Sequence, residues 1–355
     1  MKTVQLIGLV LLLAGAAFAQ DVEVDITGRT VFCVHYDDGL QAQDFSSYIT
    51  EAGAEELNFN PRDTRIGFKA VSIDGPWIFK SIFEVDFYGT NASNNLIPRL
   101  RLGYAEAAHS NGVSLRFGQD WLPIAQQFPG TVDFGVLSWG GNLWWRVPQV
   151  TARYSSGNIE ALASLAMHRN SNQQEIDEKM PWVMGRIAAK NLFGTKAMVA
   201  LGGGWRSVTV TGNEYSPHVI AAEFKLPIGN VLLNGEVYSG QGVGREFVRY
   251  GLDYNPDHPD GATEMACTGG FVNLKVPANC KLDFNVGIGM DDPEDDDLEG
   301  SSAPYLKNTV MYANLKYKMT KQFGLGVEYN DYETIGLDEV ALDGSRMTFA
   351  WWYIF

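Results

Sequence analysis

The sequence predicts an all-β fold: a transmembrane antiparallel up-and-down β-barrel of about 16 strands with one loop folded inward. Three observations support this prediction. Segments of about 9–12 residues alternate in polarity, the connections between them are short and long by turns, and the chain ends on an alternating aromatic segment. After the N-terminal stretch, no window approaches about 18 consecutive apolar residues, the length of a membrane-spanning helix. We therefore expect one barrel domain over residues 20–355.

The first residues have the features of a secretory signal peptide. Lys2 supplies a positive start, residues 4–16 are apolar, and residues 17–19 form a cleavage site of the A-x-A type. A retained membrane anchor is the alternative, but the apolar run is short and ends in small residues. The sequence thus predicts a signal peptide over residues 1–19.

The alternating segments can be assigned individually. The predicted strands are residues 22–34, 64–74, 77–88, 97–108, 113–119, 147–155, 159–169, 180–191, 196–206, 217–226, 229–239, 263–276, 281–290, 306–318, 322–332 and 345–355. Tight connections follow every even strand, and most contain Gly, Asn, Asp or Pro, as hairpin turns require. Longer polar loops follow the odd strands. This layout is typical of an outer-membrane barrel, with turns in the periplasm and loops outside.

The alternation also distinguishes the two faces of each strand. In segment 322–330, every second residue from Phe323 to Tyr329 is apolar, whereas Gly324, Gly326, Glu328 and Asn330 occupy the other face. That second face is too polar and glycine-rich for a packed core, so we expect it to line water while the apolar face meets lipid. Closure is also expected, because an open sheet edge in hydrocarbon leaves backbone groups unpaired at several kcal/mol each.

The last strand ends in aromatic residues. Positions 347, 349, 351, 353 and 355 are all large and apolar or aromatic, with the period of two expected of a lipid-facing strand. This segment is similar to the C-terminal insertion signal of outer-membrane barrels, which the barrel-assembly machinery reads. The predicted signal residues are Phe349, Trp351, Tyr353 and Phe355. A buried terminal strand of a soluble sandwich is the alternative, but so many exposed-type aromatics are unusual there.

One loop, residues 118–147, is unusually long and aromatic. It is too apolar to be solvated, and a long ordered loop of this kind is usually functional. Folding into the barrel would bury its aromatic rings, among them Trp121, Phe128 and Trp144, and would narrow the lumen to a constriction. An external lid or a subunit-contact loop is the alternative, because exposed aromatics also mark interfaces.

Charged residues follow the polar faces of several strands. A cation that points into lipid at mid-depth costs about 2–4 kcal/mol, so these side chains are expected in the lumen. The candidate pore-lining residues are Arg65, Lys69, Lys80, Arg99, Arg101, Arg116, Asp120, Asp133, Arg153 and Arg186, with Arg29, Glu84 and Asp86 as further charges nearby. Opposed charges would create a transverse field that filters ions by sign. The alternative is that the cations pair with nearby carboxylates and hold the wall.

Several function classes find no support. The net charge of −15 argues against nucleic acid as a partner. The five histidines are dispersed, no catalytic motif is present, and the acidic segment 291–300 departs from a calcium loop at its last ligand position. We therefore predict no enzyme activity, cofactor or metal. No disulfide is predicted among Cys33, Cys267 and Cys280.

Part of the chain resembles the DcaP-like trimeric porins. The similar residues are RLRLGYAE at 99–106, FGQDW at 117–121, QFPGTVDF at 127–134 and RVPQ at 146–149, so the resemblance covers residues 97–150. It implies a sixteen-stranded homotrimer whose third long loop folds inward. It also implies a pore that favours small anionic solutes, with Arg99, Arg101 and Arg116 as lumen cations.

The resulting hypothesis is a porin of the bacterial outer membrane, either general or mildly anion-selective, that lets small polar solutes diffuse passively through its water-filled lumen. Its expected partners are outer-membrane lipid, lipopolysaccharide and the barrel-assembly machinery. The alternative is a non-conducting outer-membrane barrel with a structural or adhesive role, its lumen closed by the aromatic loop.

Overall fold

The computed structural model describes residues 22–40, 48–50, 53–89, 96–168, 176–177, 180–210, 212–244, 246–248, 252–303 and 305–355. The predicted signal peptide at residues 1–19 lies outside these ranges.

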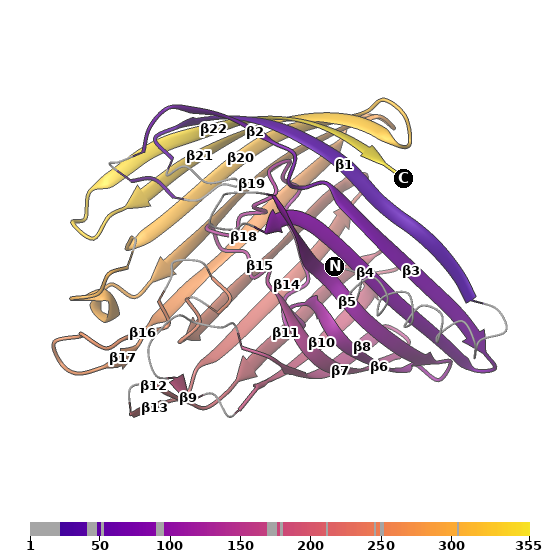
Figure 1. The fold of residues 1–355 in the computed structure, drawn as a ribbon, viewed down its shortest axis with the longest axis horizontal. Coiled ribbons are helices and arrows are strands. Elements are labelled where there is room, and N and C mark those ends of the chain that lie inside the picture. Colours follow the sequence, from indigo (N-terminus) through magenta and orange to yellow (C-terminus); the bar gives the residue numbers. More distant parts are fainter. Residues whose placement is uncertain are drawn as a thin grey trace, which may run out of the picture.

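Sixteen antiparallel strands form a closed barrel, as the sequence predicts (Figure 1). They are β1 (Val22–Asp38), β3 (Arg65–Asp74), β4 (Trp77–Gly89), β5 (Ile97–His109), β6 (Val113–Trp121), β7 (Arg146–Ser156), β8 (Ile159–Ala166), β10 (Trp182–Leu192), β11 (Ala197–Trp205), β14 (His218–Ile228), β15 (Val231–Gln241), β18 (Ala266–Pro277), β19 (Leu282–Pro293), β20 (Lys307–Lys318), β21 (Phe323–Ile335) and β22 (Ala341–Ile354).

The barrel closes between its first and last strands. β1 pairs with β22 from Arg29, opposite Ile354, to Asp38, opposite Ser345. Beyond β22, the backbone N–H of Phe355 donates to the carbonyl of Gly28 at 3.1 Å, and the N–H of Gly28 donates back to the carbonyl of Phe355 at 3.1 Å. Closure removes the open edges that lipid cannot satisfy.

Several short elements were not predicted from the sequence. β2 (Glu56–Asn60) pairs with the distal half of β1, while β3 pairs with its proximal half. β2 therefore continues the line of β3 beyond a break at residues 61–64, although residues 35–63 were predicted as loop. β9 (Ile176–Asp177), β12 (Val208–Val210), β13 (Asn213–Tyr215), β16 (Tyr254–Asn255), β17 (Thr263–Glu264) and the 3₁₀ helix η1 (Asp296–Leu298) lie in long loops. These pieces are too short to show a polarity pattern.

Short and long connections separate to opposite ends of the barrel (Figure 1). β3 and β4 are joined by residues 75–76 and β7 and β8 by residues 157–158, whereas residues 122–145 and 242–265 form long connections at the other end. The predicted alternation of turns and loops is thus confirmed. In the described part of the chain, no helix is long and apolar enough to cross a membrane.

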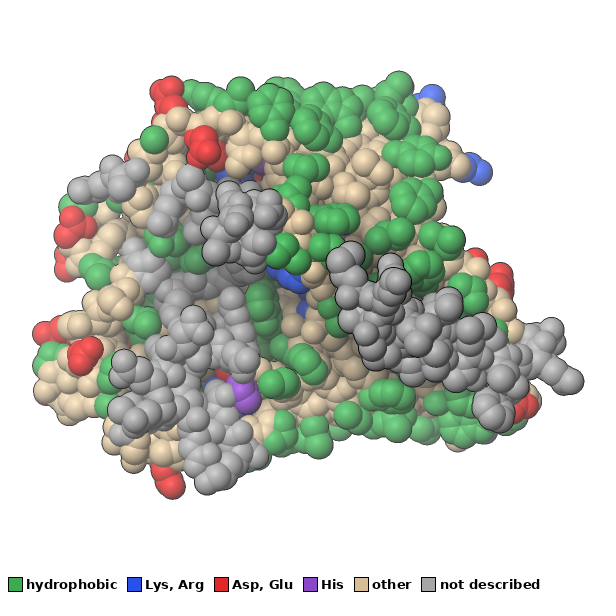
Figure 2. Space-filling view, viewed as in Figure 1, with side chains coloured by type: hydrophobic (Ala, Val, Ile, Leu, Met, Phe, Trp, Pro, Cys, Tyr) green, Lys and Arg blue, Asp and Glu red, His purple; other side chains and the backbone are tan. Residues whose placement is uncertain are grey.

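The outer surface of the strands is hydrophobic. Phe117, Ile220 and Val237 are 56–60% exposed, and hydrophobic side chains cover the strands in Figure 2, while the acidic side chains in view lie toward the strand ends. The alternate residues Arg116, Ala221 and Glu236 point inward, and Ala221 and Glu236 are buried. The predicted assignment of faces is therefore correct.

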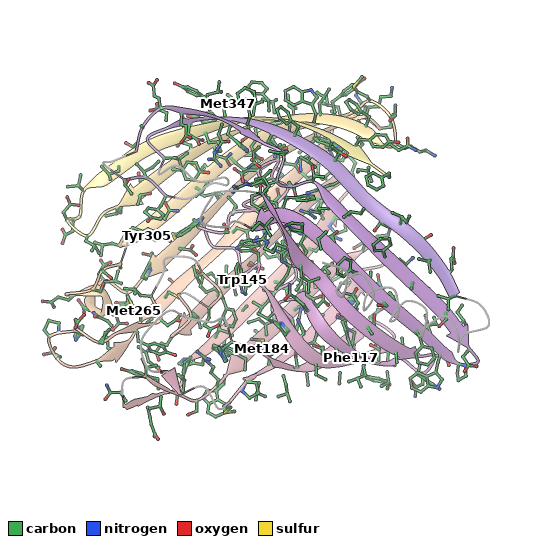
Figure 3. All side chains as sticks on the ribbon, in the orientation of Figure 1. Phe117, Trp145, Met184, Met265, Tyr305 and Met347 are labelled. Atoms are coloured by element: carbon green, nitrogen blue, oxygen red, sulfur yellow. The ribbon has the colours of Figure 1, made fainter. Side chains whose placement is uncertain are left out.

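One side of the interior is filled by loops. Leu122 and Leu143, from the connection between β6 and β7, belong to the same buried cluster as Trp182 of β10. Met265 and Tyr305, from two other long connections, join this cluster and lie at the end of the barrel that carries the long loops (Figure 3). Two cavities remain beside this packed region, one lined by residues of β1, β3, β5, β6, β20 and β22 and the other by residues of β5, β6 and β7.

Candidate pore and inward loop

The connection between β6 and β7 (residues 122–145), called the inward loop below, is held inside the barrel by carboxylates of the wall. Glu328 accepts the backbone N–H groups of Val132 at 2.5 Å and Asp133 at 2.9 Å. Glu236 accepts the N–H of Leu143 at 2.6 Å, and Glu223 accepts the N–H of Gln126 at 2.9 Å. Inward carboxylates on three strands thus satisfy loop donors that would otherwise be buried without partners.

Donors on the wall satisfy the carbonyl groups of the same loop. The side-chain amides of Asn234 and Asn314 donate to the carbonyls of Phe128, at 2.9 Å, and Gly130, at 2.8 Å. Lys316 Nζ donates to the carbonyl of Thr131 at 2.8 Å. The prediction that this loop folds inward is confirmed, and the external-lid alternative is wrong. The loop is shorter than the predicted 118–147, because pairing continues to Trp121 opposite Arg146.

The tip of the inward loop is anchored at the barrel seam, which is the junction where β1 pairs with β22. Arg346 of β22 donates through Nη1 to Asp133 Oδ2 at 2.9 Å and through Nε and Nη2 to the carboxylate of Asp37 on β1, at 2.5 and 2.7 Å. Burial opposes ionisation of Asp133, yet its pKa lies below the usual 3.8 because Arg346, His35 and the N–H of Gly135 stabilise the carboxylate. This loop carboxylate is therefore charged at neutral pH.

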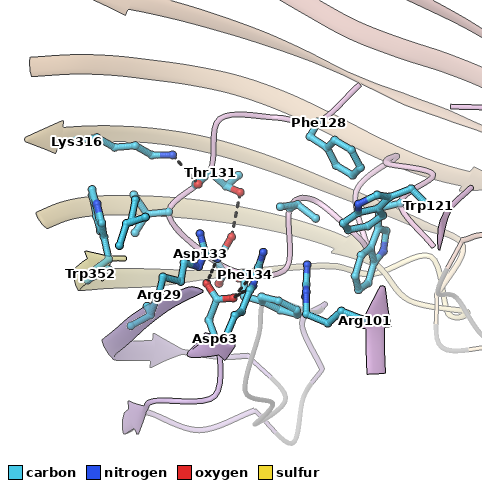
Figure 4. Close-up of a pocket in the computed structure, with 17 residues that line it drawn as sticks. Arg29, Asp63, Arg101, Trp121, Phe128, Thr131, Asp133, Phe134, Lys316 and Trp352 are labelled. Atoms are coloured by element: carbon cyan, nitrogen blue, oxygen red, sulfur yellow. Dashed lines mark hydrogen bonds and ion pairs between the residues drawn. The ribbon is translucent and has the colours of Figure 1, made fainter. Parts of the chain in front are cut away.

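A first cavity of about 430 Å³ separates the loop tip from the wall (Figure 4). Its charged lining consists of Arg29, Asp63, Arg65, Arg101, Asp133 and Lys316. Its aromatic lining consists of Trp121, Phe128, Phe134, Trp144 and Trp352. Figure 4 shows Arg101 beside Trp121, with Lys316 bonded to Thr131 across the cavity.

A second cavity of about 260 Å³ lies against β5, β6 and β7. Arg116, Arg153, Glu106 and Asp120 supply its charged lining. Trp121 and Phe128 line both cavities, and their rings meet edge to face with centroids 4.8 Å apart. This aromatic pair therefore stands between the two spaces.

Several predicted pore-lining cations are close to carboxylates. Arg101 donates to Glu84 at 2.6 Å and to Asp86 at 2.9 Å, and Asp86 is also bonded by Arg99 at 2.8 Å. The remaining predicted cations pair as follows: Arg65 with Asp63, Lys69 with Asp25, Lys80 with Glu106, Arg116 with Glu106 and Asp120, Arg153 with Glu160, and Arg186 with Glu160 and Glu223.

The structure brings together only some of the predicted residues. Arg65, Arg101 and Asp133 line the first cavity, and Arg116, Asp120 and Arg153 line the second. Lys69, Lys80, Arg99 and Arg186 line neither of these two cavities. Arg186 is buried, with 2% of its side chain exposed, where Glu223 links it to the inward loop. Phe349, Trp351, Tyr353 and Phe355 are 40–49% exposed on the outer face.

Asp37, Arg346 and Arg146 were not among the residues predicted from the sequence, whereas Glu328 was predicted only as part of the water-facing side of its strand. Arg346 is one of the alternate residues of its strand that point inward, so the period of two could have identified it. Arg146 lies at the boundary between β7 and the inward loop, where strand parity ends. Within the described residues, no group of three or more His, Cys, Asp or Glu side chains could hold a metal ion. The three cysteines are not bonded to one another.

A closed sixteen-strand barrel with an apolar outer surface and a polar lumen narrowed by an inward loop defines a channel-type membrane barrel. The family model for Gram-negative porins matches residues 6–354, and the chain belongs to this family. It is an outer-membrane porin.

Solved structures share the fold. The outer-membrane channel DcaP of Acinetobacter baumannii superposes with a TM-score of 0.83 at 19% identity, covering 95% of this chain and 99% of that one. An anion-selective porin from Comamonas acidovorans superposes with a TM-score of 0.67 at 14% identity, covering 94% of this chain and 100% of that one. OmpF of Salmonella typhi superposes with a TM-score of 0.67 at 14% identity, covering 94% of this chain and 97% of that one. No curated protein sequence matches the chain.

Proposed function

We propose that this porin is a passive diffusion channel that prefers small anionic solutes. The observation that supports the proposal is the charge of the first cavity. Four cations (Arg29, Arg65, Arg101 and Lys316) and two carboxylates (Asp63 and Asp133) line it. The second cavity is balanced, with Arg116 and Arg153 against Glu106 and Asp120. A low-dielectric wall focuses such an excess of positive charge and raises the local concentration of anions.

A further support for the proposed sign is that one structural neighbour is an anion-selective porin. The channel acts in this proposal without enzyme activity, and its aromatic inward loop narrows the path rather than closing it. The non-conducting alternative has no observation of its own in its favour.

Reversal potentials across planar bilayers test the proposal. The purified protein is inserted with a tenfold gradient of potassium chloride, and the potential of zero current is recorded. A potential of the sign set by chloride is expected. A potential of the potassium sign, or none, would overturn the proposed anion preference.

We further propose that residues 1–19 are a signal peptide, that the C-terminal aromatics of β22 are read by the barrel-assembly machinery, and that the mature barrel forms a homotrimer among lipopolysaccharide. The resemblance of residues 97–150 to the DcaP-like trimeric porins supports the trimer. N-terminal sequencing of the outer-membrane form tests cleavage after residue 19, and its mass in detergent tests the trimer.

A further inference from the structure

Arg146 lies at the junction between the inward loop and the barrel wall. It is the first residue of β7 and pairs with Trp121, the last residue of β6. Its guanidinium carbon lies 4.9 Å from the ring centroid of Trp121 and 5.7 Å from that of Trp144. Both distances are within the range of cation–π attraction, so the two rings hold the guanidinium in place.

Arg146 differs from the neighbouring arginines because it has no carboxylate partner. Among the described residues its side chain makes no ion pair or hydrogen bond, and its Nη1 atom is buried without an acceptor. Arg101 and Arg116, by contrast, each bond two carboxylates. A buried donor without an acceptor is costly, and an arginine provides five N–H donors in a planar fork. The guanidinium of Arg146 therefore has N–H donors that no protein acceptor uses.

The charges around Arg146 are mainly positive. Arg101, Arg99 and Arg65 act on its guanidinium electrostatically, and Asp86 is the carboxylate that acts on it. Asp86 already bonds both Arg99 and Arg101. Glu84 also bonds Arg101, and Asp63 bonds Arg65 and Arg29. Three carboxylates thus face five guanidiniums, so the surroundings of Arg146 attract anions.

Arg146 lies behind the aromatic residues that border both cavities, although it lines neither cavity itself. Its stacking partner Trp121 lines both of them, and Trp144 lines the first. A solute moving directly between the two cavities would therefore pass this ring. The guanidinium stacked on Trp121 is therefore next to the ring that borders both spaces.

We propose that Arg146 is the specificity-determining residue of this pore and binds oxyanions such as carboxylate, phosphate or sulfate in preference to halides. The proposal rests on the proposed anion preference and assigns it to one residue. The planar guanidinium makes two parallel hydrogen bonds to an oxyanion, whereas a spherical halide gains only charge attraction. The arginines Arg99, Arg101 and Arg116 add positive charge to the lumen, but carboxylates already accept from their guanidiniums.

Competition between inorganic phosphate and chloride tests the proposal. Chloride current through single channels in planar bilayers is titrated with sodium phosphate at fixed pH and ionic strength. Wild-type current is expected to fall saturably, which gives an inhibition constant. Arg146→Gln should weaken that constant about tenfold or more, because a charge-assisted pair of hydrogen bonds is lost.

Two further variants separate a bound oxyanion from general charge. Arg146→Lys keeps the charge but loses the fork, so it should preserve the reversal potential while phosphate inhibition weakens. Lys307→Gln removes a cation outside the cavities, paired with Asp292 at 3.3 Å, and should leave the inhibition constant within about twofold. Heat-dependent mobility on gels shows whether each variant is a folded barrel.

The outcomes are distinct. Wild-type phosphate inhibition in Arg146→Gln, or in Arg146→Lys, overturns the oxyanion site at Arg146. So does equal weakening in Lys307→Gln. If instead the wild-type reversal potential shows no anion preference while Arg146→Gln alone weakens phosphate inhibition, the proposed function fails and the site stands.

Discussion

The guanidinium of Arg346 joins the inward loop to the barrel seam through Asp133. It donates to Asp133 Oδ2 at 2.9 Å, while its other N–H groups bond both oxygens of Asp37. All three side chains are at most 2% exposed. One arginine on the last strand therefore links the first strand, the last strand and the loop that narrows the lumen.

Removing this guanidinium should loosen both the seam and the loop. Arg346→Gln leaves the carboxylates of Asp37 and Asp133 buried without their partner, which costs about 3–5 kcal/mol of unfolding free energy. We expect larger and noisier single-channel conductance. Urea unfolding in detergent and bilayer recordings measure the two effects. Lys307→Gln, which breaks a half-exposed pair, should cost about 0–1 kcal/mol. Equal losses in the two variants would contradict the role of Arg346.

Neutralising the two members of one lumen ion pair should shift selectivity in opposite directions. Asp86 is fully buried and bonds both Arg99 and Arg101. Asp86→Asn leaves these cations less compensated and should move the reversal potential toward anions, whereas Arg101→Gln should move it toward cations. Recordings in a potassium chloride gradient measure both shifts. A shift of the same sign in both variants would show that these charges do not face the ion path.

Removing the ring of Trp121 should merge the two cavities. Trp121 and Phe128 both line each space, so Trp121→Ala widens the passage between them and should raise single-channel conductance. The control is Trp77→Ala, which removes a 39% exposed ring from the outer surface. Conductance measured in one molar potassium chloride should rise only in the Trp121 variant. Unchanged conductance there would place the ion path elsewhere.

Deleting Phe355 should impair assembly of the barrel. Its backbone exchanges two hydrogen bonds with Gly28 at the seam, and its ring lies on the outer face. We expect a reduced fraction of folded protein in the outer membrane, measured by heat-dependent mobility on gels. Phe193→Ala removes a ring that is 90% exposed in a tight turn and should leave the folded fraction unchanged. A normal folded fraction without Phe355 would contradict the insertion-signal role.

Much of the fold follows from local sequence patterns. The period of two in segments such as 322–330 identifies both faces of a strand, and glycine-rich turns such as that at residues 157–158 identify the hairpins. β2 was not predicted because it is short and because it pairs with a part of β1 that extends beyond the predicted strand at residues 22–34. The inward loop was predictable because its aromatic side chains require burial.

The partners of the charged residues could not be read from the sequence. Strand parity places Arg101 in the lumen, but only the register between β4 and β5 brings it to Glu84 and Asp86. Conversely, Arg146 lies where the alternation of inward and outward side chains ends, so the sequence pattern did not place it. Its side chain lacks a carboxylate partner because of how the inward loop folds. The contacts between the loop and Glu236 or Glu328 span 93 to 196 residues of sequence.

Single-channel recording of the refolded protein tests the central claim most directly, because that claim is an open aqueous path beside the inward loop. Discrete, long-lived conductance steps are expected when the detergent-solubilised barrel is added to a planar bilayer in potassium chloride. A barrel that is folded by its heat-dependent mobility and inserted in the membrane, yet gives no steps, would contradict it.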